Sequence, residues 1–415
     1  MKKCVLGDVA DVIVSGVDKK TKDGEEKVRL CNYTDVYYNW AITSAKHDGL
    51  MEASAKPEEI RKFKIRKGQV ALTKDSETRD DIGIPTYIAD DFEDVILGYH
   101  CALITPYDKQ LDGSYLNALL RTKYAKEFFA NNAGGSGQRY YLSDASIKEL
   151  PLFLPDFAEQ KRIGKFFSSI DRKIALNRKR IATLEGMAKE IYDYWFVQFD
   201  FPDAHGCPYK SSGGAMVYNP DLKREIPKGW EVGRLADIAQ YSKEAVRSDA
   251  IDIKHYVTTD SLLQGKKGRV QAANLPPVPV SLVAFQKDDT LVANIRPYLK
   301  KIWYATESGG SSQDVLVFHP ICGELAPLLH SILWQDDFFD YVMAAAKGSK
   351  MPRGDKAHIM DYPIPLPDKK VARRFGESVE KFYAWCECAL KETESLISLR
   401  DFLLPVLMNG QVKVG

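Results

Sequence analysis

The chain has 415 residues, of which 45% are hydrophobic and 28% are charged. This length predicts two or three domains, and the composition is ordinary for a globular protein that can bury a core. The 58 Lys and Arg residues nearly balance the 57 Asp and Glu residues, so net charge neither indicates a nucleic-acid partner nor excludes a locally basic surface that binds one.

The first residues, MKKCVLGDVADV, contain two lysines, but Asp8 and Asp11 interrupt the apolar run that a signal peptide requires. No apolar run approaches the length of a transmembrane helix, so we expect no membrane association. The seven cysteines are scattered, and Cys386 and Cys388 are too close along a helix to form an unstrained disulfide. These features predict a reduced, cytoplasmic protein.

Taken in order, the chain contains one sequence pattern twice. The matching pairs of segments are 4–13 with 233–242, 32–37 with 257–262, 68–73 with 289–294, and 115–155 with 328–367. Pro151 and Pro155 recur as Pro363 and Pro367 at a constant offset of 212 residues (363 − 151 and 367 − 155). We therefore predict an internal repeat of two mixed α/β domains.

A long helix is predicted after the first copy. No proline occurs between Pro155 and Pro202, and Asp156 with Glu159 has the pattern of a capping box. Apolar residues then recur at alternating intervals of four and three, interrupted only by Asn177: Ile163, Phe167, Ile170, Ile174, Ile181, Leu184, Ala188, Ile191 and Trp195. Forty helical residues span about 60 Å, which is too long for the core of one small domain.

A second long helix is predicted from Asp368 to about Gly410, with Pro405 expected to distort its last turns. Its apolar stripe consists of Phe375, Val379, Phe382, Cys386, Ala389, Thr393, Leu396, Leu399 and Leu403. Neither helix can bury its stripe alone. We expect the two to form an antiparallel coiled coil about a pseudo-two-fold axis, in which Asn177 fixes the register at some cost in stability.

The predicted fold class is therefore α+β, with two similar mixed α/β domains separated by a long antiparallel two-helix coiled coil. The predicted boundaries are 1–154 for the first domain, 155–199 for the central helix, 200–228 for a linker, 229–366 for the second domain and 367–415 for the C-terminal helix. Two diverged domains held apart by a rigid spacer suit a split nucleic-acid site, whose half-sites are spaced in steps of the ~34 Å helical turn.

Three motifs carry a family resemblance: LPLFLPDFAEQKRIGKFFSSIDRKIALNRKRIATLEGMAKEIYDYWFVQFDFP at 150–202, IPKGWEVGRLADIA at 226–239 and NIRPYLKKI at 294–302. With these motifs the chain resembles the specificity (S) subunit of Type I restriction–modification enzymes. The resemblance implies two target-recognition domains that read the halves of a bipartite sequence in double-stranded DNA. It also implies that the helices dock two modification (adenine methyltransferase) subunits, and that restriction subunits join the assembly. The second helix matches the family pattern less cleanly than the first.

The resemblance further implies that this chain holds no cofactor, and that S-adenosylmethionine, ATP and Mg are needed only by the partner subunits. The residues agree with a non-catalytic chain, because a Walker loop is absent and residues 274–277 (NLPP) have the wrong order for a methylase motif. Asp156, Glu159 and Lys161 imitate a nuclease set, but helix capping explains them better. His205 and Cys207 lack a second ligand pair at zinc spacing, so no metal site is predicted.

The candidate DNA-binding residues of the first domain lie in two loops. The loop 131–141 (NNAGGSGQRYY) offers Ser136, Gln138, Arg139 and Tyr140, and the exit of a predicted strand offers Lys74 and Arg79. Gln suits adenine and Arg suits guanine in the major groove, while Lys and Ser suit phosphates. The alternative is a solvated polar loop, as for the basic run 61–67.

The second domain offers DNA-binding candidates at the equivalent positions. They are Ser349, Lys350, Arg353 and Lys356 in the loop 347–356 (KGSKMPRGDK), and Arg296, Tyr298, Lys300 and Lys301 after the equivalent strand. Similar polar loops at the same position of two diverged copies favour DNA binding over chance.

Partner docking is predicted on the central helix, in competition with simple packing between the helices. The candidates are Asp171, Arg172, Asn177, Tyr192, Tyr194, Trp195 and Phe196. The aromatic residues at the helix end exceed what one seam can bury, so a partner or the neighbouring domain must cover some of them.

Two other functions are compatible with the sequence. One is a specificity module detached from a fused restriction–methylation enzyme, which a methyltransferase domain in the same polypeptide would indicate. The other is a coiled-coil adaptor with two protein-binding domains and no affinity for DNA.

Overall fold

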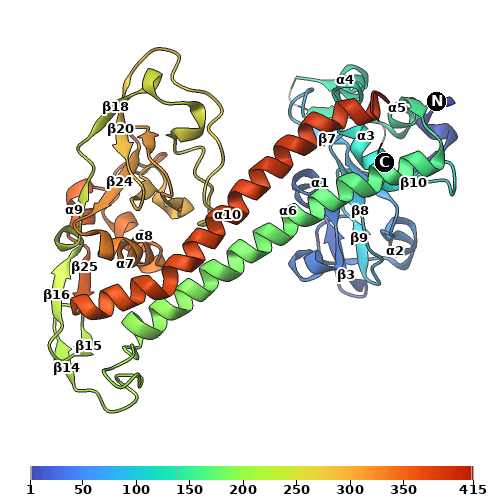
Figure 1. Cartoon of the computed structure of the whole chain (residues 1–415). Coiled ribbons are helices and arrows are strands. Elements are labelled where there is room, and N and C mark those ends of the chain that lie inside the picture. Colours follow the sequence, from blue (N-terminus) through green and yellow to red (C-terminus); the bar gives the residue numbers. More distant parts are fainter. Residues whose placement is uncertain (1, 138, 413, 415) are drawn as a thin grey trace. The chain divides into compact units, whose positions relative to one another are not determined.

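The structure is a computed structural model that describes residues 2–137, 139–412 and 414. The chain folds into two compact units: unit 1 consists of Met1–Leu176 and Ser395–Gly415, and unit 2 consists of Asn177–Glu394. Each unit combines helices with strands (Figure 1), in agreement with the predicted mixed class. Within the described ranges, no helix is long and apolar enough to cross a membrane.

Unit 1 is built from thirteen strands and five short helices in the described part of the chain, followed by the start of the long helix α6 (Phe157–Tyr192). The strands are β1 (Lys2–Val5), β2 (Ala10–Val14), β3 (Glu26–Cys31), β4 (Ala41–Ile42), β5 (Met51–Ala55), β6 (Val70–Thr73), β7 (Asp75–Ser76), β8 (Pro85–Ile88), β9 (Val95–Leu97), β10 (Cys101–Pro106), β11 (Gly134–Ser136), β12 (Arg139–Tyr141) and β13 (Pro151–Leu154). The short helices are α1 (Tyr33–Tyr38), α2 (Pro57–Phe63), α3 (Gly113–Leu120), α4 (Lys123–Asn132) and α5 (Asp144–Lys148).

Unit 2 contains the remaining strands, three short helices and most of the long helix α10 (Lys369–Met408). The strands are β14 (Met216–Asn219), β15 (Arg224–Pro227), β16 (Glu231–Arg234), β17 (Ala239–Tyr241), β18 (Ala245–Arg247), β19 (Tyr256–Val257), β20 (Ser281–Phe285), β21 (Thr290–Ala293), β22 (Ile302–Tyr304), β23 (Gly309–Ser311), β24 (Val315–Pro320) and β25 (Pro363–Leu366). The short helices are α7 (Ala326–Leu333), α8 (Asp336–Ala344) and α9 (Lys356–Met360).

The two units share a topology, as the repeated sequence predicts. In unit 1 the first strand β1 pairs antiparallel with the last strand β13, and in unit 2 β16 pairs in the same way with β25. The central sheet of unit 1 has the order β2-β10-β6-β8-β4, and that of unit 2 has the order β17-β24-β21-β22. The pairs α3–α4 and α7–α8 follow these sheets at equivalent places in the chain.

The central strands of unit 1 are buried on both faces. All four residues of β6 are buried, as are the first four of β10. Leu72 of β6 lies opposite Ala102 of β10. Continuous apolar runs of this length are typical of strands covered on both sides.

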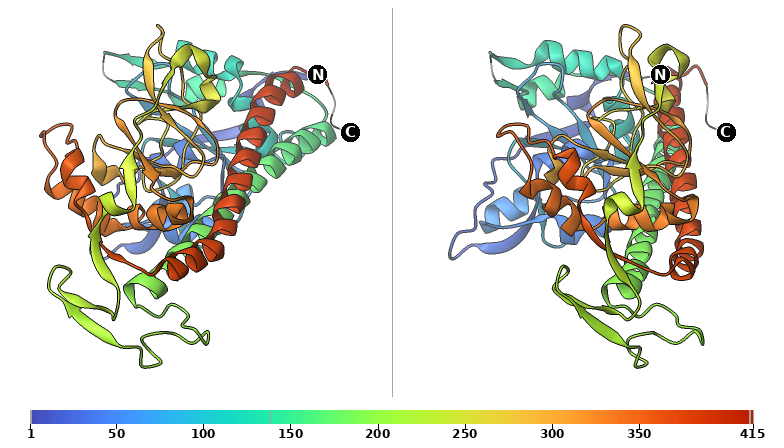
Figure 2. Two further views of the ribbon diagram at one scale, coloured as in Figure 1. Left: turned by 60° about the vertical axis from the view of Figure 1, so that its left-hand side comes forward. Right: turned by 90° about the vertical axis from the view of Figure 1, so that its left-hand side faces the viewer.

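The long helices take part in both units. In unit 2 their segments run antiparallel, because Tyr192 contacts Phe375 (6.2 Å between ring centroids), whereas Asn177 lies beside Ala389. Figure 2 shows the two helices side by side along these segments. In unit 1, Phe167 of α6 and Leu404 and Leu407 of α10 belong to one buried cluster.

The helix ends agree with the predicted caps only in part. The Asp156 carboxylate accepts a hydrogen bond from the Glu159 amide (2.9 Å), but the Glu159 carboxylate binds Arg162 instead of completing a capping box. Pro405 does not end the helix, because α10 continues through it to Met408. Burial of Leu404 and Leu407 holds these turns, whereas Leu399 of the predicted stripe is exposed.

Candidate nucleic-acid interface

A small sheet in unit 1 brings the two predicted DNA-binding segments together. Strand β12 pairs with β11 on one side and with β7 on the other, so that Tyr140 lies opposite Ser76. The loop 131–141 therefore adjoins the exit of strand β6, where Lys74 and Arg79 were predicted. Ser136 and Arg139 are exposed on this sheet, and Gln138 lies outside the described residues.

Arg79 and Tyr140 form a cation–π pair across this junction. The guanidinium carbon of Arg79 lies 5.0 Å from the centroid of the Tyr140 ring. Arg79 itself is exposed, whereas Tyr140 is half-buried and packs against the core of unit 1. The ring therefore holds an exposed guanidinium over the sheet, in an orientation that suits contact with an anionic or base-edge ligand.

Asp75 organises the neighbouring charges. Its carboxylate accepts hydrogen bonds from the Lys74 ammonium (2.7 Å) and from Nδ1 of His100 (2.6 Å). Burial alone would raise the pKa of Asp75, but the hydrogen bonds from Lys74 and His100 outweigh it and lower the pKa. Lys74 is thus ion-paired with Asp75, and its ammonium group is less available to a phosphate than we expected.

Arg139 lies beside this group without being locked into it. Its Nη2 atom is 3.2 Å from Nδ1 of His100, but one nitrogen cannot donate to Asp75 and accept from Arg139 at the same time. The shorter contact to the charged carboxylate prevails, so no acceptor on Nδ1 of His100 holds Arg139. Its guanidinium can turn toward a ligand at little cost.

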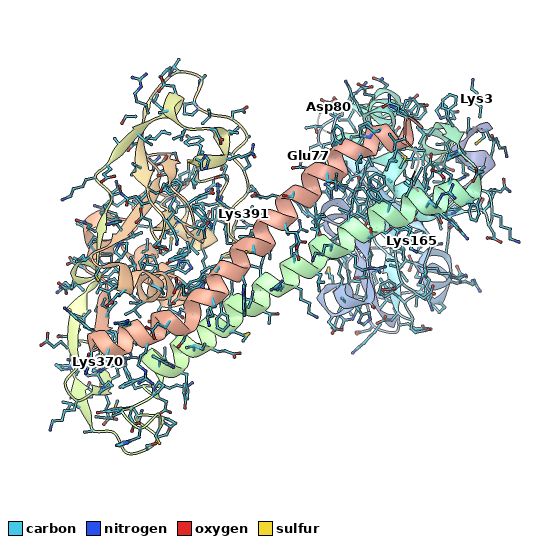
Figure 3. All side chains as sticks on the ribbon, in the orientation of Figure 1. Lys3, Glu77, Asp80, Lys165, Lys370 and Lys391 are labelled. Carbon is cyan, nitrogen blue, oxygen red and sulfur yellow. The ribbon has the colours of Figure 1, made fainter. Side chains whose placement is uncertain are left out.

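An open pocket of about 670 Å³ adjoins these residues, with His100 and Arg139 on one side and the tyrosines of α1 on the other. Within it, the Tyr37 hydroxyl donates to the Asp81 carboxylate (2.8 Å). Glu77 and Asp80 are exposed on the loop that follows β7 (Figure 3). The pocket therefore combines aromatic, acidic and basic groups that can contact base edges.

Sequence reasoning missed His100 and the tyrosines of α1. The YTDVYY segment of α1 could have indicated this site, since clustered aromatic residues beside a basic loop are typical of nucleic-acid contacts. His100 has φ of +71°, a left-handed conformation that no local motif predicts for histidine.

In unit 2 the equivalent segments also meet. Ile295 forms an isolated bridge with Arg353, and the Arg296 amide donates to the Pro352 carbonyl (2.8 Å). Arg296 is half-buried, with its Nε atom buried and without a hydrogen-bond partner in the described part of the chain. The exit of strand β21 and the loop 347–356 thus form one surface.

This surface leaves Tyr298, Ser349, Lys350, Arg353 and Lys356 exposed. Arg353 pairs with Asp314 (3.2 Å), and the Lys356 ammonium lies 5.9 Å from the centroid of the Tyr241 ring. An exposed ion pair contributes little stability, so Arg353 can exchange Asp314 for another anionic or acceptor group.

Lys300 and Lys301 differ from the prediction. The Lys300 ammonium donates to Asp336 (2.7 Å), and the Lys301 ammonium donates to the Thr259 carbonyl (2.5 Å). Hydrogen bonds from Lys266 and Lys300 lower the pKa of Asp336 to about 2. These two lysines therefore tie together segments of unit 2, and their ammonium groups are directed into the unit instead of toward a ligand.

The predicted docking residues fall into two groups. Tyr192, Trp195 and Phe196 are buried in the core of unit 2, where all three rings contact Phe375. The chain itself covers these aromatics, so they are unavailable to a partner in this conformation. Asn177 is also buried, and its side-chain amide donates to Glu392 (2.8 Å) and toward the Ala389 carbonyl (3.5 Å).

The other docking candidates stay accessible. Arg172 and Tyr194 are exposed and Asp171 is half-buried. His205 and Cys207 are exposed in the linker. In the described ranges, no group of three or more His, Cys, Asp or Glu side chains is arranged to hold a metal ion.

Comparison with known proteins shows what the chain is similar to. Residues 1–186 match the family model described as "Type I restriction modification DNA specificity domain". The chain is 26% identical over 325 residues to the type I restriction enzyme MjaIX specificity subunit of Methanocaldococcus jannaschii, covering 72% of this chain and 69% of the relative.

Two further proteins are similar over almost the whole chain. The putative type I restriction enzyme MjaX specificity subunit of the same organism is 23% identical over 99% of this chain and 93% of its own length. The crystal structure of a type I restriction–modification system S subunit from M. genitalium has the same fold, with a TM-score of 0.57 and 15% identity over 98% of this chain and 95% of the other. Together with the duplicated topology, these matches show that residues 1–186 carry a type I restriction–modification DNA specificity domain and that the chain is similar along its length to specificity subunits of type I restriction enzymes.

Proposed function

We propose that the chain reads a bipartite sequence in double-stranded DNA with two target-recognition domains, residues 1–154 and 229–366. The observation that supports this most directly is the repeated juxtaposition of a strand exit with a polar, basic loop. In unit 1 the pairing of β7 with β12 joins these segments, and in unit 2 the bridge between Ile295 and Arg353 joins their equivalents.

The chemistry of each surface suits a different part of the target. Arg79 and Arg139 in unit 1 and Arg353 in unit 2 are exposed arginines. Their partners are the Tyr140 ring, His100 and Asp314 respectively, and arginine pairs with guanine through two hydrogen bonds. Ser136, Ser349, Lys350 and Lys356 are suited to phosphates, which position the protein without reading sequence. Because the residues of the two units differ, the two half-sites differ as well.

The helical regions 155–199 and 367–415 are proposed to act as an antiparallel coiled-coil spacer between the domains, which the linker 200–228 connects. Helix α6 has 36 residues and α10 has 40, which correspond to about 54 Å and 60 Å. Such lengths suit a spacer that separates two half-sites on one duplex.

The same helices are proposed to dock two modification subunits, and restriction subunits are proposed to join this assembly. Asp171, Arg172 and Tyr194 are the proposed docking residues, because they are the predicted candidates with surface left uncovered. In this proposal S-adenosylmethionine, ATP and Mg are bound by the partner subunits, and the methyltransferase partners flip the target adenine out of the duplex.

Methylation mapping tests the proposal. Cells that express the modification subunits with and without this chain are compared by sequencing that detects modified adenine. The expected result is a pair of short motifs at fixed separation, with one modified adenine in each, that disappears when the chain is absent. Modification that is independent of the chain, or a single uninterrupted motif, would contradict the proposal.

A further inference from the structure

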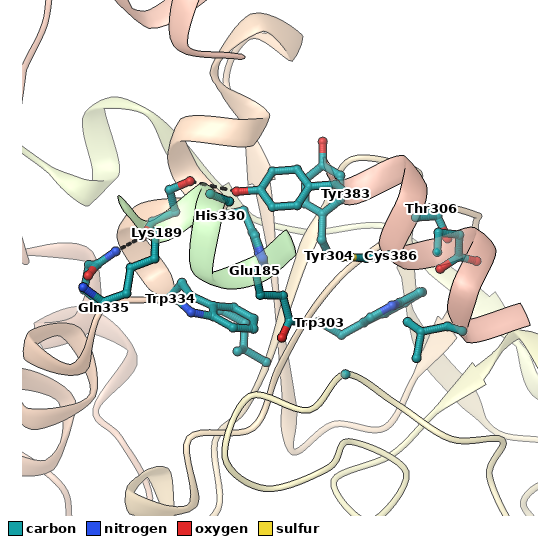
Figure 4. Close-up of a pocket in the computed structure, with 16 residues that line it drawn as sticks. Glu185, Lys189, Trp303, Tyr304, Thr306, His330, Trp334, Gln335, Tyr383 and Cys386 are labelled. Atoms are coloured by element: carbon teal, nitrogen blue, oxygen red, sulfur yellow. Dashed lines mark hydrogen bonds between the residues drawn. The ribbon is translucent and has the colours of Figure 1, made fainter. Parts of the chain in front are cut away.

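Unit 2 contains a cavity of about 50 Å³ that the DNA-reading function does not use. It lies between the α6 and α10 segments of that unit on one side and β22 and α7 on the other, and we call it the unit 2 pocket (Figure 4). Its wall includes Trp303, Tyr304, Trp334 and Tyr383, together with the carboxyl group of Glu185. A cavity of this size exceeds the 10–15 Å³ or so that one water needs, so it has room for a small polar head group.

The aromatic wall is tightly arranged. The centroids of Tyr304 and Tyr383 are 5.1 Å apart, and His330 lies 5.5 Å from Trp334 and 5.2 Å from Tyr383. Both indoles already attract cations of the chain: the guanidinium of Arg269 lies 4.4 Å from Trp303, and the ammonium of Lys266 lies 5.7 Å from Trp334. The face of an aromatic ring carries partial negative charge, and proteins bind ammonium groups on such faces.

Glu185 lacks a counter-charge in this wall. Its carboxyl group points between the two tryptophans (Figure 4), and no hydrogen-bond or ion-pair partner for it is found among the described residues. Among the other polar groups of the wall, Gln335 donates to the Ser331 carbonyl (2.9 Å) and the Ser331 and Tyr383 hydroxyls share a hydrogen bond (2.9 Å). The Thr306 hydroxyl is buried and has no hydrogen-bond partner among the described residues.

The nearby cations do not supply the missing charge. Lys189 binds Asp193, Lys266 binds Asp336 (2.8 Å), and Arg269 binds Glu307. Each of these cations already has a carboxylate partner. An unpaired carboxyl group beside aromatic faces is the arrangement that a bound cation would complete.

We propose that the unit 2 pocket binds the primary ammonium group of a linear alkylamine, with Glu185 as the counter-ion and Trp303, Trp334, Tyr304 and Tyr383 as the aromatic wall. The cavity admits the ammonium head and its adjacent methylene groups, and the rest of the molecule extends from the mouth. This site is separate from the DNA-reading surfaces, and it does not depend on the proposed function.

Proton release accompanies binding. Burial raises the pKa of Glu185 to about 8, so the empty pocket holds a neutral carboxyl group at pH 7, and a cation favours its ionised form. The titratable and charged groups that face it are Lys189 on α6, Tyr304 on β22, His330 on α7, and Tyr383, Cys386 and Glu387 on α10. Burial lowers the pKa of His330 to about 3 and raises that of Cys386 to about 12, so neither changes its charge between pH 6 and 8. Affinity should therefore rise with pH, by up to about tenfold per unit below pH 8.

Calorimetric titration of the purified full chain tests the site. The probe is n-butylammonium chloride, and the controls are n-butanol, which has the same shape without the charge, and sodium chloride at equal ionic strength. Saturable binding of the amine alone is expected. Glu185→Gln should weaken it at least about tenfold, while Glu387→Gln, which alters a wall carboxylate already paired with Lys391 (3.0 Å), should change it less than about twofold.

A second probe, Nα-acetyl-lysine amide, separates the possible sources of the ammonium group. Tighter binding of n-butylammonium assigns the pocket to free amines, and tighter binding of the lysine derivative assigns it to a lysine side chain of a protein. Circular dichroism verifies that Glu185→Gln is folded. Absence of saturable binding by both amines, or equal binding to the wild type and to a folded Glu185→Gln, would overturn the proposal.

Discussion

Arg139 is the side chain through which unit 1 is best placed to read a base. It is exposed on β12, and its Nη2 atom lies 3.2 Å from Nδ1 of His100. We predict that Arg139→Ala relaxes the preference for one base pair in the half-site of unit 1 by about 1–3 kcal/mol. Selection of bound duplexes from a random pool by the assembled enzyme measures this preference.

The matched control for this change is Arg61→Ala. Arg61 is an exposed arginine of the same unit in a basic run that has the character of a solvated face. Its loss should lower affinity slightly for all sequences and leave the motif intact. If Arg139→Ala behaves like Arg61→Ala, Arg139 contacts phosphate or solvent and does not read a base.

Glu185 makes the stability of unit 2 depend on pH. Burial raises its pKa in the folded state to about 8, above the ordinary value of 4.5, so between these values the folded state binds more protons than the unfolded state. Stability therefore falls as pH rises from about 5 to 8. Because the side chain is only partly removed from solvent, we expect this loss to be on the order of 2 kcal/mol at most.

We predict that Glu185→Gln unfolds at a higher denaturant concentration than wild type at pH 8, and that the two midpoints converge near pH 5. Tryptophan fluorescence reports this transition well, because Trp195, Trp230, Trp303, Trp334 and Trp385 lie in unit 2 and only Trp40 lies in unit 1. Glu190→Gln, at an exposed position of the same helix, should give no such divergence. Parallel midpoints for Glu185→Gln and wild type across this pH range would contradict the prediction.

The individual contacts of the candidate sites were the least predictable from sequence. Residue type and loop position predicted Arg79, Arg139 and Arg353 as DNA-binding candidates, and the structure leaves all three exposed. Lys300 and Lys301 appeared equivalent to them in sequence, but their ammonium groups bind Asp336 and Thr259. The Thr259 carbonyl lies 42 residues away from Lys301, and no local pattern specifies a partner at that separation.

Between α6 and α10 of unit 2, Asn177 is a polar residue in an otherwise apolar contact. It is buried beside Ala389 and donates to Glu392 (2.8 Å), while Ile181 and Leu184 pack on Cys386 and Ala389. A buried amide makes the folded state less stable than an apolar side chain would. In a shifted register, however, the amide would face apolar residues without a hydrogen bond, so it disfavours other registers.

We predict that Asn177→Leu raises the free energy of unfolding of unit 2 by about 1 kcal/mol and produces self-associated species. Denaturant unfolding and analytical ultracentrifugation measure the two effects. Ile181→Leu, a swap that conserves volume in the same contact, should change both quantities little. A less stable and strictly monomeric Asn177→Leu would show that the amide contributes packing or hydrogen bonding more than register.

Periodicity predicted the long helices well, because an apolar repeat over 36 or 40 residues is unambiguous. It did not predict how the final turns of α10 are buried, where Leu404 and Leu407 replace Leu399 at the core of unit 1. The sequence also indicated that the aromatic residues near Tyr192 are more than one helix seam can bury, but it did not indicate which residues cover them. Phe375 and Trp230, which are distant in sequence, supply much of this cover.

For the complete chain, duplication implies that the two reading surfaces act independently. Arg139 lies in unit 1 and Arg353 lies in unit 2. We predict that the double variant Arg139→Ala/Arg353→Ala relaxes both half-sites, each by the amount seen in its single variant, with energies that add within about 0.5 kcal/mol. Motif selection with the two single variants and the double variant tests this additivity.

The spacing of the motif should stay unchanged in all three variants, because the helices are not altered. A change in spacing, or a loss of the second half-site when only the first is altered, would show that the two units recognise DNA as one cooperative surface.

The internal repeat was predictable because it rests on self-similarity, which needs no knowledge of contacts. The offset between Pro151 and Pro363 marked β13 and β25 correctly as equivalent strands. The segment 32–37 was matched to 257–262, yet the first forms helix α1 whereas the second contains the end of strand β19 and a turn. The domain interiors have diverged too far for pairwise similarity to locate their equivalent elements.

The pairing of first and last strands has an evolutionary consequence. Each domain enters through β1 or β16 and leaves through the antiparallel partner β13 or β25, so its two ends meet in one ribbon. The segment of chain between these strands therefore begins and ends at neighbouring points of the structure. Genetic recombination with breakpoints in the ribbon would exchange this whole segment without altering either long helix. Under the proposed function, such an exchange would replace one half-site of the DNA target in a single event.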